Sequence, residues 1–297
     1  MHLDSGRDPL ASPVGQAIIV HGTDEQRARL LPTTASGPDP YCVGFAEPAH
    51  GSDLASVETG GHVDGRAIIV SGTKAWVAHA DQASAILVLC RTEPTAPRME
   101  NLSCVLVPLA DDHIELRPLR QMTGEDTLFE VHLDGARAPV ENIIGGRGGG
   151  WRVAMSTVAF VRAARADAGH RALEREFWDL VETARQHGRD GDPLVRQQLA
   201  WAFAQVRTLR VLALRRPSPS AAELSLRAVL TSEYHRRLGE IAMDVTGTVG
   251  LVRPEGEAYT TSRWQHVFLS SRAETIAGGT SELQRTIIAE RLLGLPR

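Results

Sequence analysis

The sequence has few cysteines, no excess of basic residues and no long apolar run. Its three cysteines include no CxxC pair, which argues against a disulfide framework and indicates a reducing compartment. Lys and Arg number 32 and Asp and Glu number 36, so the formal charge is −4 and no basic surface for nucleic acid is expected. No run approaches the roughly 18 apolar residues of a membrane span, and the N-terminus lacks the apolar core of a signal peptide. We therefore expect a cytoplasmic protein that binds neither nucleic acid nor membranes.

The composition is that of an ordinary globular protein. Of the 297 residues, 42% are hydrophobic and 23% are charged, and a chain of this length usually forms about two domains. Residues 1–37 hold only about two helical segments. One covers the apolar stretch from Val14 to Val20, and the other runs from Asp24 to Leu31 after Thr23 as its N-cap. This region is too small to close a core alone.

Residues 38–144 have the period of two that is typical of β-strands. Six short segments rich in Val, Ile and Leu lie between clusters of turn residues. They are YCVGFAEP, RAIIVSGTKAWVA, ASAILVLCR, LSCVLVPL, HIELRPL and LFEVHLDGARAP. This spacing indicates a small barrel or two packed sheets, and we expect a middle β-barrel. The following glycine run at 145–150 is interpreted as a flexible joint.

Residues 151–297 have the helical period of 3.6. One apolar stripe follows Pro193 and consists of Leu194, Val195, Leu199, Ala202, Phe203, Val206, Leu209 and Leu212. Similar stripes cover 151–187, 221–246 and 281–293, and residues 215–222 form a loop between helices. The predicted fold class is therefore α+β and multidomain, with a short N-terminal helical remnant, a β-barrel and a C-terminal four-helix bundle.

Four segments carry a family resemblance. FAEPAHGSDLAS (45–56), GTKAWVAHA (72–80), RQMTGED (120–126) and TIAGGTSELQRTIIAERLLGLPR (275–297) together resemble the acyl-CoA dehydrogenase family. The sequence is similar to subunits of the heteromeric steroid-type enzymes of the actinobacterial branch. The resemblance implies that FAD lies between the β-domain and the helical bundle. It also implies that a carboxylate base removes the α-proton of an acyl-CoA thioester while the β-hydride passes to the flavin.

The resemblance also assigns cofactor and substrate contacts. The implied FAD contacts are the main chain of Phe45 and Ala46, the ring of Trp76, the position of Ala78, and Thr280 with Glu282. Ser52 and Arg162 are the implied substrate contacts. Simpler interpretations stay open, because residues 47–53 could be only a turn, Trp76 only a core aromatic and Thr280 only a helix cap. Ala46 and Ala78 replace residues that usually carry a hydroxyl.

The catalytic base does not match the family pattern. By resemblance, the base precedes either a glycine near the C-terminus or an arginine on the first bundle helix, and these positions hold Gly278 and Val161. Glu274 is a weak candidate for the base, whereas it could equally be a solvated or salt-bridged acid, like Asp167 and Glu174. The nucleotide-binding segments at 184–193 and 244–250 are also weak matches. No metal site is predicted.

Three interpretations remain open. The chain could be an FAD-dependent dehydrogenase with an unrecognised base. It could be one subunit of a complex, as a homo-oligomer or as a hetero-oligomer with a full-length homologue, since the family's N-terminal helices are short here. It could also be a non-catalytic paralogue or binding scaffold that has lost flavin chemistry.

Overall fold

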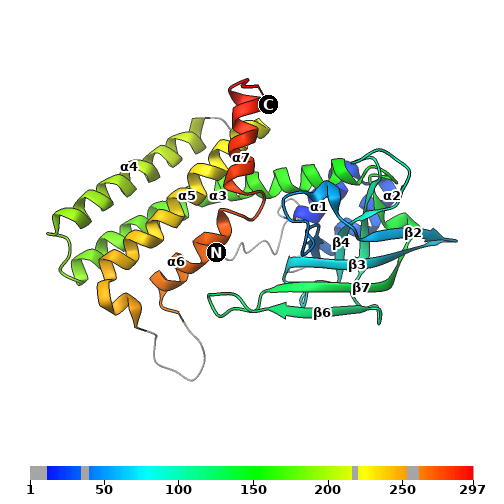
Figure 1. Cartoon of the computed structure of the whole chain (residues 1–297), viewed down its shortest axis with the longest axis horizontal. Helices are drawn as coiled ribbons and strands as arrows, with labels where there is room; N and C mark the ends of the chain where they lie inside the picture. The colour runs from blue at the N-terminus through cyan, green and yellow to red at the C-terminus, as the bar shows by residue number, and fades with distance from the viewer. Residues whose placement is uncertain (1–11, 35–39, 216–219, 253–260, 297) are drawn as a thin grey trace. The chain divides into compact units, whose positions relative to one another are not determined.

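The computed structural model describes residues 12–34, 40–215, 220–252 and 261–296, without the side chains of 164–169, 215 and 221. The chain forms two compact units. The first contains Met1–Gln121 and Asp126–Phe160, and the second contains Met122–Glu125 and Val161–Arg297. Figure 1 shows the elements of each unit, which are described separately below.

The first unit holds two short helices and all of the described strands. The helices are α1 (Pro13–His21) and α2 (Asp24–Thr34), with short 3₁₀ turns η1 (Leu54–Ser56) and η2 (Val140–Asn142). Both helices are capped. Ser12 accepts a hydrogen bond from the Gly15 amide at 3.0 Å, and Thr23 exchanges reciprocal bonds with Gln26. The predicted cap at Thr23 is confirmed, and the helix continues three residues past the expected end.

The strands form one eight-stranded mixed sheet. They are β1 (Tyr41–Gly44), β2 (Gly60–Asp64), β3 (Ala67–Ala78), β4 (Ala85–Arg91), β5 (Leu102–Pro108), β6 (Ile114–Leu119), β7 (Leu128–Pro139) and β8 (Ile143–Ile144). Their order is β6-β7-β3-β2-β4-β5-β8, and β1 pairs with β4. Figure 1 shows β6, β7 and β3 side by side. The six predicted strands are present.

Two strands were not predicted. β2 reads GGHVD, which resembles a turn because of its glycines and its exposed residues. It pairs with β3 through a tight hairpin in which Asp64 opposes Ala67 and Gly65 has a φ of 59°. β8 is only two residues long and pairs with β5. Neither strand has enough apolar alternation to be visible in the sequence.

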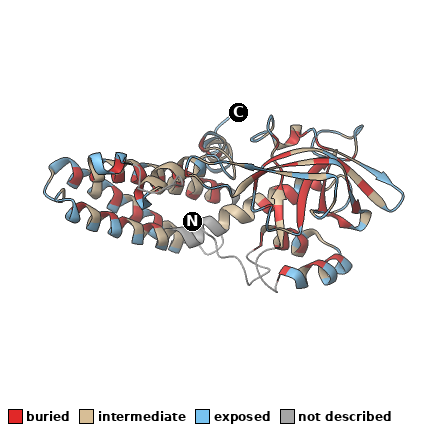
Figure 2. Ribbon diagram, turned by 90° about the horizontal axis from the view of Figure 1, so that it is seen from below, coloured by how far each residue is buried: buried red, intermediate tan, exposed pale blue. Residues whose placement is uncertain are grey.

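Strands β4 and β5 are buried on both faces. Alternate residues such as Val88 and Val105 lie in a core shared with β3 and β7. The intervening residues, such as Leu87 and Leu106, pack with Ile18 of α1 and with Val153 near the start of helix α3 (Gly150–Gln186). Figure 2 shows buried residues along these strands. The sheet is therefore folded over one core and covered by helices on its other side.

The glycine run at 145–150 is a packed turn. Gly145, Gly146 and Gly148 have positive φ angles of 76°, 78° and 73°, which glycine tolerates best. A Cβ atom on Gly150 would lie 2.5 Å from the main chain of Ser103 in β5. These glycines let the chain turn sharply against the sheet, so the run does not act as the open joint that the sequence indicated.

The second unit is a helical bundle. Its helices are α3 (Gly150–Gln186), which begins in the first unit, α4 (Pro193–Arg215), α5 (Ala221–Thr246), α6 (Arg263–Glu274) and α7 (Ser281–Ile287), with short turns η3 (Gly247–Leu251) and η4 (Ile288–Leu292). One core joins α3, α4, α5 and α6 and includes Leu180, Val206, Leu238 and Trp264. The four-helix bundle is confirmed, but its fourth helix is α6 and not the predicted 281–293 segment. α7 packs against α5 instead.

The predicted stripe on α4 is correct in part. Val195, Ala202 and Val206 are buried, whereas Leu194 and Phe203 are exposed by 75% and 41%. Of the predicted loop at 215–222, residues 216–219 lie outside the described residues, and the helices reach into its two ends, since α4 ends at Arg215 and α5 begins at Ala221. Among the helices that are described, each is too short or too polar to cross a lipid bilayer.

Candidate functional site

In the first unit, hydrogen bonds to main-chain carbonyls hold the segment after β1 against β3. Phe45 is buried and its carbonyl oxygen accepts a hydrogen bond from Lys74 Nζ at 3.1 Å. The carbonyl of Ala46 accepts one from the amide of Ala75 at 3.0 Å. Both residues that the resemblance assigned to the flavin therefore lie against β3, with their main-chain atoms fixed.

A buried ion pair anchors the same segment. Glu47 Oε1 lies 2.8 Å from Lys74 Nζ, and the Glu47 carboxylate also accepts bonds from the amides of Glu58 at 2.6 Å and Thr59 at 2.8 Å. Burial alone would raise the pKa of Glu47, but the Lys74 charge and these donors outweigh it and lower the pKa. The sequence did not predict this pair. Its only signal is that Lys74 is the one charged residue of β3.

Trp76 lies on a β-bulge near the end of β3. The pairing with β7 is interrupted between Lys74 and Val77, and Trp76 has a φ of 61°, a rare conformation for an aromatic residue that costs about 1–3 kcal/mol. Its side chain is 62% exposed. The interpretation of Trp76 as a core aromatic is therefore wrong, because the bulge turns the ring outward. Ala78 ends the strand and is also exposed.

The loop that carries Ser52 is polar and surface-exposed. Asp53 precedes the turn η1, and its carboxylate accepts a hydrogen bond from Ser56 Oγ at 2.7 Å and contacts Arg98. Ser52 itself is exposed. The loop thus combines the expected turn chemistry with an accessible hydroxyl at position 52.

In the second unit, the two positions at which the family carries its base are close together. Arg162 Nε donates a hydrogen bond to the carbonyl oxygen of Gly278 at 2.6 Å, and Val161 directly precedes Arg162. Gly279 has a φ of 109°, and a Cβ atom there would lie 2.7 Å from Arg162 Nη2. Burial lowers the pKa of Arg162. The Arg162 side chain therefore links both positions. Neither position carries an acid, and the charged group between them is the Arg162 guanidinium.

The turn after Gly278 begins helix α7. Thr280 is the N-cap, and its hydroxyl accepts a hydrogen bond from the Leu283 amide at 3.2 Å. Gln284 Nε2 donates to the carbonyls of Gly278 and Gly279 at 3.1 and 3.3 Å. Glu282 lies exposed in the first turn. The predicted capping role of Thr280 is confirmed. Hydrogen bonds from Arg162 and Gln284 hold the loop in front of it.

Glu274 forms part of a buried ionic cluster. His235 is 7% exposed, with Nδ1 2.8 Å from Glu274 and Nε2 2.9 Å from Glu176. Burial alone lowers the pKa of His235, but the two carboxylates outweigh this effect and raise the pKa to about 10. Glu274 is thus a salt-bridged acid, as its simpler interpretation proposed.

The other two acids near the expected base position are Glu174 and Asp167. Glu174 pairs with Arg207 and Arg210 at 3.4 and 3.1 Å. The side chain of Asp167 lies outside the described residues.

The two weakly matching nucleotide segments also meet in the second unit. Arg189, in the turn after α3, pairs with Asp192 at 2.9 Å. Its guanidinium also lies 3.5 Å from the carbonyl oxygen of Asp244, and 3.7 Å from where a Cβ atom on Gly247 would be. Segments 184–193 and 244–250 are therefore neighbours, although sequence alone did not relate them.

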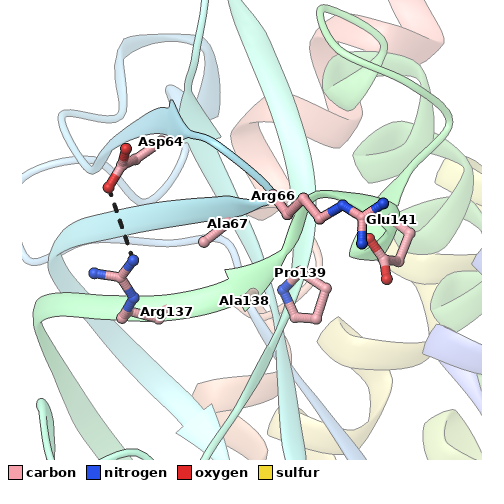
Figure 3. A pocket seen from close by; sticks show the side chains of 7 residues that line it. All are labelled: Asp64, Arg66, Ala67, Arg137, Ala138, Pro139 and Glu141. Atoms are coloured by element: carbon pink, nitrogen blue, oxygen red, sulfur yellow. Dashed lines mark ion pairs between the residues drawn. The ribbon is translucent and has the colours of Figure 1, made fainter.

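A shallow groove of about 760 Å³ lies at the far end of β3 from Trp76. Figure 3 shows its lining, in which Arg137 pairs with Asp64 at 3.8 Å. Ala67 and Trp76 are separated by nine residue steps along the strand, roughly 30 Å. Within the first unit, this groove is therefore remote from Trp76. Among the described residues, no cluster of three or more His, Cys, Asp or Glu side chains is arranged to hold a metal ion.

Comparison with known proteins assigns the family. Residues 42–136 match the acyl-CoA dehydrogenase middle domain, and residues 148–293 match the acyl-CoA dehydrogenase C-terminal domain. The acyl-CoA dehydrogenase IpdE1 of Mycobacterium tuberculosis is 40% identical over 288 residues, which are 96% of this chain and 74% of that protein. The chain belongs to the acyl-CoA dehydrogenase family. This family consists of FAD-dependent flavoproteins, so the expected cofactor is confirmed.

Other relatives agree with the predicted branch of the family. FadE34 of Mycobacterium tuberculosis is 36% identical over 94% of this chain and 38% of its own length. The solved structure of the Tcur3481-Tcur3483 steroid acyl-CoA dehydrogenase superposes with a TM-score of 0.89, at 27% identity over 97% of this chain and 77% of that one. The ChsE4-ChsE5 complex from Mycobacterium tuberculosis has a TM-score of 0.82 and 26% identity over the same shares. Both solved proteins pair two different chains.

The residues of this chain fit parts of FAD. Trp76 presents an exposed ring beside a fixed main chain in the first unit, which suits a flat isoalloxazine. The half-buried Gly278–Thr280 turn in the second unit begins helix α7, and a helix start suits a phosphate-bearing group.

Proposed function

We propose that this chain is one subunit of an FAD-dependent acyl-CoA dehydrogenase and that a homologous partner subunit supplies the catalytic glutamate. One observation carries the proposal. The two family positions for the base hold Val161 and Gly278, and the charged group that donates a hydrogen bond to the Gly278 carbonyl is the Arg162 guanidinium. A fixed cation at this place would favour the ionised form of a carboxylate brought beside it.

The relatives support a heteromeric steroid-type enzyme. The Tcur3481-Tcur3483 protein is a steroid acyl-CoA dehydrogenase, and ChsE4-ChsE5 is a complex. We therefore infer that the substrate is a bulky, steroid-derived acyl-CoA thioester. In the same proposal, Ser52 contacts the acyl-CoA chain and Arg162 contacts the substrate near its reacting end.

The cofactor contacts are inferred to come mainly from the main chain. When bound, FAD supplies the acceptor for the β-hydride of the substrate. Trp76 would cover the ring system, the main chain at 45–46 and at Ala78 would provide hydrogen bonds, and Thr280 with Glu282 would contact the nucleotide. Ala46 and Ala78 have no hydroxyl, so each removes a hydrogen bond of about 0.5–1.5 kcal/mol that amide groups would have to replace.

The test is to compare the chain alone with a complex. The chain is purified alone and together with a full-length homologue that carries a Glu-Arg pair on its first bundle helix. We expect acyl-CoA to bleach the flavin absorption of the complex and not that of the chain alone. In the complex, glutamine in place of the partner's glutamate should abolish bleaching. Glu274→Gln in this chain should leave bleaching unchanged, because Glu274 is paired with His235.

The possible results separate the three interpretations. Bleaching of flavin on the isolated chain at the rate of the complex would contradict the proposal and indicate a complete enzyme. Loss of bleaching in the Glu274→Gln variant would identify Glu274 as the base. Colourless protein in both preparations that still binds an acyl-CoA would indicate a scaffold without flavin chemistry.

A further inference from the structure

Lys74 is a fully buried lysine in the middle of the first unit. Its side chain has no exposed surface, and that of its partner Glu47 is 6% exposed. Burying two charges is unfavourable unless their geometry and additional hydrogen bonds compensate for the lost water. A pair of apolar side chains of similar volume often stabilises a core equally well. The presence of the ion pair here therefore calls for an explanation beyond stability.

The additional hydrogen bonds of this pair all go to the main chain. Lys74 Nζ binds the Phe45 carbonyl at 3.1 Å. The Glu47 carboxylate accepts bonds from the amides of Glu58 and Thr59. The pair thus joins three separate segments, at 45–47, at 58–59 and on β3. It fixes the position of main-chain atoms, which an apolar pair could not do.

The bulge that exposes Trp76 begins directly after Lys74. Lys74 still pairs with Val131 of β7, and Val77 resumes the pairing opposite Phe129. Between them, Ala75 donates its amide hydrogen to the Ala46 carbonyl. Lys74, Ala75 and Val77 are all buried, whereas Trp76 is 62% exposed, so within the bulge Trp76 alone turns outward. The position of Trp76 consequently depends on the contact between β3 and segment 45–47.

We infer that Lys74 and Glu47 are positioning residues for the flavin face of the first unit. Their ion pair holds the main chain of Phe45 and Ala46 and the ring of Trp76 in one fixed arrangement. This inference rests on the proposed function, since it takes Trp76 and segment 45–46 as flavin contacts. Neither charged group touches the cofactor in this arrangement, because both are enclosed beneath that face.

The experiment separates positioning from stability. The variants are Lys74→Met, and the double variant Glu47→Gln with Lys74→Met. The single variant leaves a buried carboxylate without its cation, whereas the double variant leaves no unpaired charge. The double variant should therefore recover much of the lost melting temperature. In both variants the Phe45 carbonyl loses its Nζ donor, so the main chain at 45–46 loses its fixed position.

Two measurements are made on each full-length variant. FAD affinity is measured by titration of deflavinated protein in the complex with its partner, and we expect Kd to rise about tenfold or more in both variants. The second measurement is the ¹⁹F NMR spectrum of the chain without FAD, labelled with 5-fluorotryptophan at its five tryptophans. The Trp76 resonance is assigned with Trp76→Phe, and we expect it to shift or broaden while the other four stay in place.

Val107→Ala is the matched control. Val107 is fully buried in β5 and belongs to the same core, but it makes no contact with segment 45–47 through hydrogen bonds. It should lower the melting temperature without changing FAD affinity or the Trp76 resonance.

The outcomes distinguish this inference from the proposed function. A double variant with normal FAD affinity and an unshifted Trp76 resonance would overturn the inference and leave the pair as a structural contact only. If the wild-type complex binds no FAD, the proposed function fails, and the flavin part of the inference fails with it. The Trp76 resonance would still show whether the pair fixes the bulge.

Discussion

The two units carry the family's motifs in different ways. In the first unit, the residues assigned to the flavin are held by main-chain hydrogen bonds and by the buried pair of Glu47 and Lys74. In the second unit, the assigned positions meet through Arg162 and the Gly278 carbonyl, but Val161 and Gly278 provide no acid. The first unit therefore has a platform built from the backbone, whereas the second holds no acid at the two positions that the resemblance assigns to the base.

This difference shows which parts of a site tolerate substitution. A contact made by an amide or a carbonyl does not depend on the side chain, as the main-chain hydrogen bond from Ala75 to Ala46 illustrates. A base requires one ionisable group at one place, so one substitution removes it. A subunit that depends on a partner can therefore retain the cofactor face and still lack the base.

The largest expected effect tests the buried pair of the first unit. Glu47→Ala leaves Lys74 without its counter-charge and two amides without an acceptor, so the free energy of unfolding should fall by about 3–5 kcal/mol, measured by urea denaturation. Glu115→Ala is the control, because Glu115 and Arg117 form an ion pair that is more than half exposed, and its denaturation midpoint should not change. Equal effects of the two substitutions would contradict the structural importance of burial here.

The second prediction concerns the core of the helical unit. Leu238 is fully buried in α5, so Leu238→Ala should cost about 2–5 kcal/mol through lost packing and a cavity. Leu194 is 75% exposed, and Leu194→Ala should leave stability nearly unchanged. Circular dichroism at 222 nm during thermal unfolding measures both variants. A larger effect at Leu194 would mean that a partner or another copy of the chain covers this face.

The third prediction uses the pKa of His235. This pKa is raised from 6.5 to about 10 by Glu176 and Glu274, so the folded state binds a proton more tightly than the unfolded state does. The stabilisation is therefore complete below pH 6.5 and disappears as the pH rises to about 10. His235→Gln should lower stability by on the order of a few kcal/mol at pH 6.

The same comparison across pH provides the control for His235. The difference in melting temperature between wild type and His235→Gln should shrink steadily between pH 6.5 and pH 10. A difference that stays constant over this range would mean that His235 is neutral in the folded protein.

The smallest expected effect concerns the turn that precedes α7. Thr280→Ala removes the N-cap hydroxyl that binds the Leu283 amide and should cost about 0.5–2 kcal/mol, measured by thermal unfolding. Thr280→Ser keeps the hydroxyl and should retain most of the stability. If serine were as damaging as alanine, the methyl group and not the cap would be the important feature.

The sequence predicted the elements with strong local patterns. Six apolar strands, the cap at Thr23 and the buried positions Val195 and Val206 on α4 all follow from periodicity or cap chemistry. It missed β2, whose glycines resemble a turn, and α6, in which only Trp264, Val267 and Ser271 are buried among polar residues. These elements depend on neighbours for their stability and have weak patterns of their own.

Site geometry was less accessible than the fold. Trp76 lies in a strand in which alternation would place an aromatic residue in the core, and only the bulge reverses it. The ion pair of Glu47 and Lys74 has no motif that relates its two members. The family motifs indicated where the site lies, but they did not indicate how its parts are held.

By itself, the sequence determined the six strongly patterned strands, the long helices of the bundle, the family and the residue types at the expected base positions, because these depend on local patterns and on residue identity. Only the tertiary structure decided that Arg162 meets Gly278, 116 residues later, and that Lys74 meets Glu47 inside the sheet. The physical reason is that these contacts form where packing brings distant segments together, and burial then makes the geometry of each charged group decisive.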